Sequence, residues 1–244
     1  MGRSKDIATS AKGDADYVNV SGDTMTGGLT VDAGNGNQLL LDNDGERFTQ
    51  VSFKNSGSQY AAVWYDNSIN VLVNHAASGK GYVVQTGGST DRLVIDSSGR
   101  VTLPSQPSFY AYPSVTSYST PSNSWFTCAF NTVGWDVGSN YNGSNYRFTA
   151  PVAGKYLITW MLQLENSNEP NWIYAYPIVN GSRSVNRSKG KSFSDFKVSP
   201  SYHTENGAWI MNLAANDYVT FDMITSGASK DFKGESHWSG ILLG

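Results

Sequence analysis

One segment limits the fold more than any other, because its alternating positions are apolar on both sides. In Lys155-Tyr-Leu-Ile-Thr-Trp-Met-Leu-Gln-Leu164, one face would carry Tyr156, Ile158, Trp160, Leu162 and Leu164. Leu157 and Met161 would lie on the other face. The next segment behaves alike: Trp172, Tyr174, Tyr176 and Ile178 alternate with Ile173, Ala175 and Val179. A strand of an antiparallel sandwich normally has one wet face. We therefore expect a second apolar partner, and another subunit could supply it.

The rest of the chain also favours strands. No stretch has the spacing of an amphipathic helix of three turns or more, although Ser4 to Lys12 could form a short one. Aromatic residues make up 13% of the chain, which is typical of strands. Hairpin turns are indicated by four Asn-Gly pairs, at Asn35-Gly36, Asn142-Gly143, Asn180-Gly181 and Asn206-Gly207.

A short phrase repeats in the first hundred residues. Leu39-Leu-Leu-Asp-Asn-Asp-Gly45 resembles Leu93-Val-Ile-Asp-Ser-Ser-Gly99, and a looser copy covers 29–36. Each is an apolar strand followed by Asp-x-x-Gly, which suits a type I turn. Further strands are predicted at Thr49–Lys54, Gln59–Asp66, Ile69–Asn74 and Tyr82–Thr86.

A change in composition divides the chain. Four of the eight prolines fall within 104–123, so we place a boundary near Pro104, between regions 1–104 and 105–244. The strands before it are thin and rarely hold a fold alone. We expect the C-terminal region to fold and to associate by itself.

Composition and charge exclude several classes of protein. A net charge of −3 lacks the basic footprint of a nucleic-acid-binding protein. The sequence contains no run of 18 apolar residues, so we do not expect membrane insertion. The N-terminus shows no signal peptide. We expect Cys128, the single cysteine, to be a buried structural thiol beside Phe126 and Phe130. No nucleophile elbow, carboxylate pair or spacing of metal-ligating histidines is present, so we do not expect an enzyme or a cofactor.

Two resemblances refine this interpretation. Asp16-Tyr-Val-Asn-Val-Ser-Gly-Asp-Thr-Met-Thr-Gly-Gly-Leu-Thr-Val31 resembles a phrase of bacteriophage tail fibres, and 91–109 is similar to the junction before the last domain of such fibres. Residues 105–244 resemble the C1q/TNF-like jelly roll. That similarity rests on Arg147-Phe-Thr-Ala-Pro-Val-Ala-Gly-Lys-Tyr156, Ala214-Ala-Asn-Asp-Tyr-Val-Thr220 and His237-Trp-Ser-Gly-Ile-Leu-Leu243. Asn216 and Trp238 stand where the family has Gly and Phe.

The resemblance implies an all-β homotrimer, with a trimeric β shaft or attachment region followed by a jelly-roll knob. Its family is trimeric about an apolar axis, which implies a partner for the strands apolar on both faces. Candidate residues for the trimer interface are Met25, Tyr156, Trp160, Trp172, Tyr174 and Tyr176. Members of the family sometimes bind calcium, but no ligands can be assigned in this sequence. For residues 1–30 a flexible leader is the alternative.

Two polar stretches could bind a host surface. The first, between Arg183 and Lys197, holds five cations. The second, Glu165–Trp172, ends in an aromatic residue that could contact a sugar. The candidate receptor-binding residues are Trp172, Arg183, Arg187, Lys189, Lys191 and Lys197, whose cations pair well with phosphate groups of a glycan. The plainer interpretation of both stretches is a solvated loop.

The functional prediction is a phage tail-fibre or receptor-binding component of the virion tail, made in the host cytoplasm. Its partners would be its own copies, a host surface glycan or receptor, and other tail or baseplate proteins. The alternative is a structural tail protein whose knob only trimerises or docks to another virion protein. A secreted C1q-like adhesion protein is a further alternative, and a polysaccharide depolymerase is disfavoured.

Overall fold

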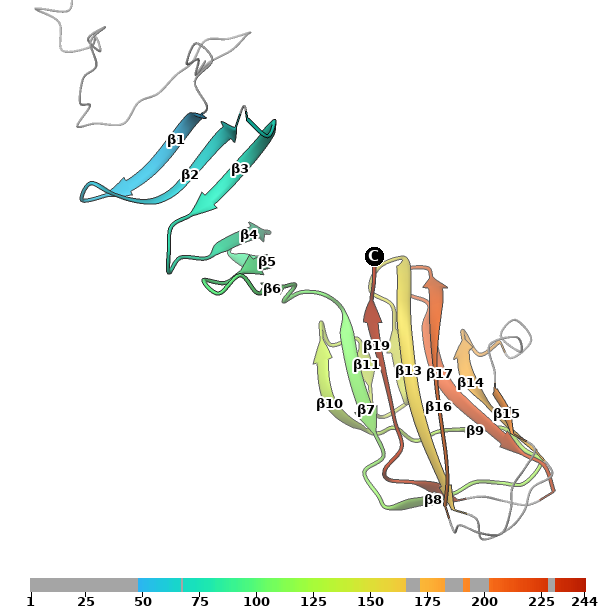
Figure 1. The fold of residues 1–244 in the computed structure, drawn as a ribbon. Coiled ribbons are helices and arrows are strands. Elements are labelled where there is room, and N and C mark those ends of the chain that lie inside the picture. The colour runs from blue at the N-terminus through green and yellow to red at the C-terminus, as the bar shows by residue number, and fades with distance from the viewer. Residues whose placement is uncertain (1–47, 67, 166–171, 183–190, 194–201, 228–230) are drawn as a thin grey trace, which may run out of the picture. The chain divides into compact units, whose positions relative to one another are not determined.

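The computed structural model describes residues 48–66, 68–165, 172–182, 191–193, 202–227 and 231–244 (Figure 1). Every regular element in these ranges is a β-strand, and all strand pairs are antiparallel, which confirms the predicted all-β fold. None of the described residues forms a helix long and apolar enough to span a membrane. The chain divides into two units, Met1–Ala77 and Ser78–Gly244.

The described part of the first unit forms a three-stranded sheet in the order β1-β2-β3. Its strands are β1 (Phe48–Asn55), β2 (Ser58–Asp66) and β3 (Val71–Ala76). Strand β3 starts at Val71, two residues later than the predicted strand Ile69–Asn74. The delay follows from a turn at 68–70, where Oδ1 of Asp66 accepts hydrogen bonds from the Ser68 N–H and hydroxyl. Phe53 and Leu72 remain 56% and 67% exposed, so this sheet has no complete core of its own within the described residues.

The second unit begins with a small sheet of β4 (Tyr82–Thr86), β5 (Thr90–Ile95) and β6 (Val101–Thr102). The predicted Asp-x-x-Gly turn follows β5. The Asp96 carboxylate accepts hydrogen bonds from the N–H groups of Ser98 and Arg100, and Gly99 adopts a positive φ of 81°. The two earlier copies of the phrase lie outside the described residues. The predicted boundary at Pro104 falls between β6 and β7, inside this unit, and stays a prediction.

The rest of the unit is a sandwich of two antiparallel sheets. The first sheet has seven strands, and the register places β19 and β16 on opposite sides of β13. These strands are β10 (Thr132–Val137), β7 (Ser108–Tyr112), β19 (His237–Leu242), β13 (Gly154–Glu165), β18 (Asp231–Lys233), β8 (Ser117–Ser119) and β16 (Tyr202–Leu213). Figure 1 shows β10, β7, β19 and β13 side by side.

The second sheet has six strands, with β17 between β12 and β14. Its strands are β11 (Tyr141–Asn142), β12 (Arg147–Thr149), β17 (Tyr218–Thr225), β14 (Ile173–Val179), β15 (Lys191–Phe193) and β9 (Phe126–Thr127). The core between the sheets is rich in rings, among them Phe109, Phe130, Phe148, Phe221 and Trp238, each with 0% exposure. Cys128 is also fully buried there, as predicted.

One of the predicted turns is wrong. Asn206-Gly207 lies in the middle of β16, directly opposite Met161 and Trp160 of β13. A Cβ on Gly207 would lie 2.6 Å from Nε1 of Trp160, so the glycine makes room for a buried indole rather than for a turn. Asn180-Gly181 does form a turn, with φ values of 51° and 69°. Asn142-Gly143 begins the turn between β11 and β12, and Asn35-Gly36 lies outside the described residues.

Candidate functional site

Strand β13 is apolar on both faces, as the sequence predicts, but the two faces have different environments. Its residues alternate between fully buried positions facing the second sheet and half-buried positions on the outside. On the outside, Leu157 pairs with Ile210 of β16 and with Ile241 of β19. Ile210 is 61% exposed and Ile241 is 41% exposed. Three strands thus present a row of aliphatic side chains away from the core.

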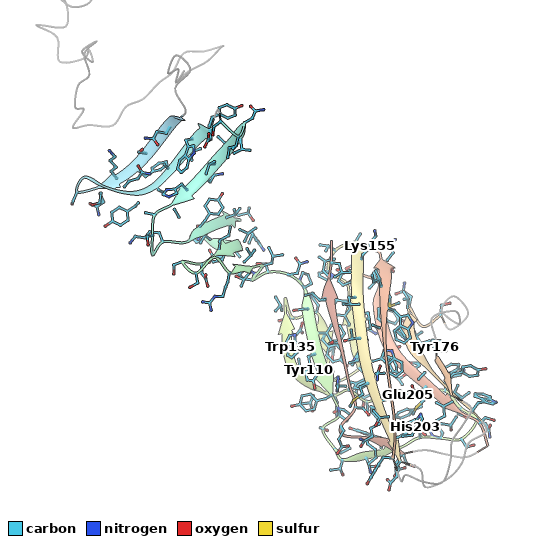
Figure 2. All side chains as sticks on the ribbon, viewed as in Figure 1. Tyr110, Trp135, Lys155, Tyr176, His203 and Glu205 are labelled. Atoms are coloured by element: carbon cyan, nitrogen blue, oxygen red, sulfur yellow. The ribbon has the colours of Figure 1, made fainter. Side chains whose placement is uncertain are left out.

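Rings extend this outer face toward β7 and β10. Tyr110 of β7 stacks on Trp135 of β10, with ring centroids 4.7 Å apart and planes 14° apart, and the two lie together in Figure 2. His237 of β19 lies 5.5 Å from the Tyr110 ring. Trp135 is 53% exposed. We call the surface formed by Tyr110, Trp135, Leu157, Met161, Ile210 and Ile241 the outer apolar face.

Two of the residues proposed for a trimer interface lie in the core of the single chain. Tyr156 is 0% exposed and Trp160 is 2% exposed, and both face the second sheet. They therefore offer almost no surface to a neighbouring subunit. The sequence marks both faces of β13 as apolar, but the larger side chains fill the sandwich, and the smaller Leu157 and Met161 point outward. Met25 lies outside the described residues.

Three other candidates from that set gather on the outside of the second sheet. Tyr174 and Tyr176 alternate along β14 with the buried Ile173 and Ala175, so their rings point away from the core. Trp172, just before β14, packs against Tyr174 with ring centroids 4.8 Å apart. These three residues help to line a pocket of about 420 Å³ together with Trp125 and Ile224. Trp125 and Ile224 come from distant segments, and no local sequence signal places them there.

Most of the predicted cationic site falls outside the described residues. Arg183, Arg187, Lys189 and Lys197 lie outside the described residues. Lys191 lies in β15, where its backbone pairs with that of Ala175. Its assignment to receptor binding stays a prediction.

Buried polar groups of the sandwich make structural hydrogen bonds. The Tyr141 hydroxyl donates to the Phe130 carbonyl at 2.7 Å and accepts from Nε1 of Trp238 at 3.2 Å. Burial raises the pKa of Tyr141 well above its ordinary value, although the Trp238 hydrogen bond opposes this shift. Burial also raises the pKa of the Cys128 thiol, with a further contribution from the charge of Asp222. A thiol held in this protonated state is a poor nucleophile.

Two separate pairs of polar side chains lie at the sandwich end where β13 pairs with β18. Nε2 of His203 lies 2.9 Å from the Glu205 carboxylate, both on β16, and the Lys233 ammonium lies 3.0 Å from Glu165 (Figure 2 labels the first pair). Across the described residues, no group of three His, Cys, Asp or Glu side chains is arranged to hold a metal ion. The described residues thus include an exposed apolar face and an aromatic pocket.

Among the comparisons with known proteins, only the one with solved structures finds similar chains. No family model matches the sequence, and neither does any curated protein. The globular domain of zebrafish complement 1qA protein is similar over 57% of this chain and 98% of its own length, with 15% identity and a TM-score of 0.41. Murine APRIL is similar over 57% and 99%, with 10% identity and a TM-score of 0.40. The Eiger TNF of S. frugiperda is similar over 57% and 93%, with 10% identity and a TM-score of 0.42.

All three are jelly-roll domains of the C1q and TNF type. Each alignment spans nearly the whole of the other protein but little more than half of this chain. The antiparallel sandwich itself rests on the strand pairing described above.

Proposed function

We propose that this chain is a self-associating, receptor-binding component of a bacteriophage tail fibre. Its C-terminal sandwich would be a trimeric knob that attaches the virion to a glycan or protein of the host surface. The observation that carries the proposal is the outer apolar face, because Ile210, Leu157 and Ile241 form a continuous aliphatic row across three strands. The Trp135 ring adds to the same face.

Such a face is costly to leave in water. Burying apolar surface contributes about 25 cal/mol per Å², and contiguous exposed apolar patches mark interaction sites. Within the described residues, β16 also pairs on one side only, with β13. A second copy of the chain would cover both the apolar row and this open strand.

The resemblance of residues 16–31 and 91–109 to phage fibre sequences supports the tail assignment. Multiple copies on one axis would let weak surface contacts add up through avidity, which can exceed single-site affinity by about 100-fold or more. The virion tail is the proposed location, and other tail or baseplate proteins are the proposed partners. Tail or baseplate genes beside the gene for this chain would support the assignment independently.

Attachment can be tested with the fluorescently labelled full chain on a panel of bacteria, including strains with truncated lipopolysaccharide and without capsule. We expect binding to some strains and its loss when the surface glycan is removed. Ile210→Asp should weaken cell binding by disrupting association, whereas Asn145→Asp, in the turn between β11 and β12, should not. Failure of the full chain to bind cells of any strain in the panel would contradict the proposal.

A further inference from the structure

The outside of the second sheet carries an aromatic pocket that assembly through the outer apolar face would leave open. The described residues that line it are Trp125, Trp172, Tyr174, Tyr176 and Ile224. The register of β14 and β17 places Tyr174 opposite Ile224, and the register of β17 and β9 brings the 125–127 segment beside them. Three segments far apart in the sequence thus line one hollow, with four rings from two of them and Ile224 from the third. Its volume of about 420 Å³ lies within the usual range of ligand pockets, about 300–1,000 Å³.

The rings differ in how much water reaches them. Tyr176 is only 2% exposed, and Trp125 contacts it edge-on, with centroids 5.3 Å apart and planes at 76°. Tyr174 is 40% exposed and meets the half-buried Trp172 at 52°. The pocket therefore combines sheltered rings with accessible ones. None of these four rings belongs to the cluster of buried side chains between the two sheets.

The chemistry of the lining favours a neutral ligand with both apolar and polar faces. Among the described residues that line it, none is a lysine, arginine, aspartate or glutamate. Aromatic faces carry partial negative charge, which attracts the C–H groups on one side of a sugar ring. The phenol and indole groups supply polar edges that can hydrogen-bond to sugar hydroxyls.

We propose that this pocket binds a neutral pyranose unit of a surface glycan. The inference rests on the proposed function and names the ligand class of the binding component. Trp172 would keep the sugar-binding role suggested by the sequence, with Tyr174, Tyr176 and Trp125 as partners. A quaternary ammonium group is the other ligand that aromatic walls attract, but the pocket is much larger than one such group.

Saturation-transfer NMR on the full chain tests the proposal. The probes are the methyl glycosides of glucose, galactose, mannose and N-acetylglucosamine at millimolar concentration, with choline chloride as the competing class. We expect transfer to the ring protons of at least one glycoside. Trp172→Ala and Tyr174→Ala should each weaken that binding by about tenfold, the effect of losing one stacking contact.

Phe53→Ala, which removes another exposed ring in the first unit, is the matched control and should leave binding unchanged. Melting curves check that each variant folds, and Trp172→Ala and Tyr174→Ala provide independent tests. The proposal would be overturned if no glycoside shows transfer, or if both pocket variants show the same transfer as the wild type. It would also be overturned if choline, and none of the glycosides, binds the pocket. The mass of the assembly is measured separately, so failure of the pocket is distinguishable from failure of association.

Discussion

Replacing Gly207 by alanine tests how the sandwich core is packed. The new Cβ would lie 2.6 Å from Nε1 of Trp160 and 2.8 Å from both Cε2 and Cζ2. Real Cβ atoms do not approach neighbours this closely, so the indole or the strand must move. The indole has little room to move, because Trp209 stacks on it at 5.5 Å and Phe221 contacts it at 5.2 Å.

The expected cost follows from overpacking a buried ring. Such changes destabilise proteins by about 1–3 kcal/mol, and the confinement of Trp160 places Gly207→Ala in the upper part of that range, at about 2–3 kcal/mol. For a unit of this size, each kcal/mol lowers Tm by about 2–4 °C, so we expect a loss of about 4–12 °C. Differential scanning calorimetry measures this directly.

An exposed residue away from the core and from the outer apolar face provides the control. Asn145 is exposed in the turn between β11 and β12, so Asn145→Asp should change the free energy of unfolding by less than about 0.5 kcal/mol. Combining Gly207→Ala with Trp160→Phe should cost less than the sum of the two single changes, because the smaller ring leaves space for the methyl group. A Gly207→Ala protein that melts within the error of the wild type would refute this account of the packing.

Two further predictions concern buried titratable groups. The pKa of Tyr141 is raised in the folded state, so its contribution to stability is complete below the ordinary tyrosine pKa of 10.0 and is lost as pH rises above it. Tyr141→Phe should lower stability at neutral pH by about 1–3 kcal/mol, because the Phe130 carbonyl and the Trp238 indole lose their partner. It should also flatten the loss of stability at alkaline pH; a chemical-denaturation series across pH that runs parallel to the wild type would argue against this. Cys128 should not react with a disulfide reagent in the folded protein but should react fully after unfolding in guanidinium, and rapid stoichiometric labelling of native protein would show that the thiol is accessible.

Much of the fold follows from local sequence patterns. Tyr82–Thr86 is predicted with the bounds that the structure gives it, and Asp96 organises its turn through hydrogen bonds that depend only on nearby residues. Period-two alternation also identifies β13 and β14 as strands with two apolar faces.

Other features depend on contacts that sequence spacing does not contain. Alternation does not say which face of β13 is the inner one, so the sequence predicts an interface role for Tyr156 and Trp160, whereas both fill the core. Asn206-Gly207 has the composition of a turn, but the Trp160 ring on the paired strand explains the glycine. The aromatic pocket needs Trp125 and the 172–176 segment together, which only the pairing of β9, β17 and β14 achieves.

Measuring the mass of the full chain in solution tests the central claim, association through the outer apolar face, most directly. Sedimentation equilibrium at micromolar concentration should give the mass of three chains of 26.4 kDa each. Ile210→Asp and Leu157→Asp place a charge in the aliphatic row and should shift the mass toward a single folded chain, whereas Asn145→Asp should remain trimeric. A wild-type protein with the mass of one chain, or folded row variants that stay fully trimeric, would contradict the account.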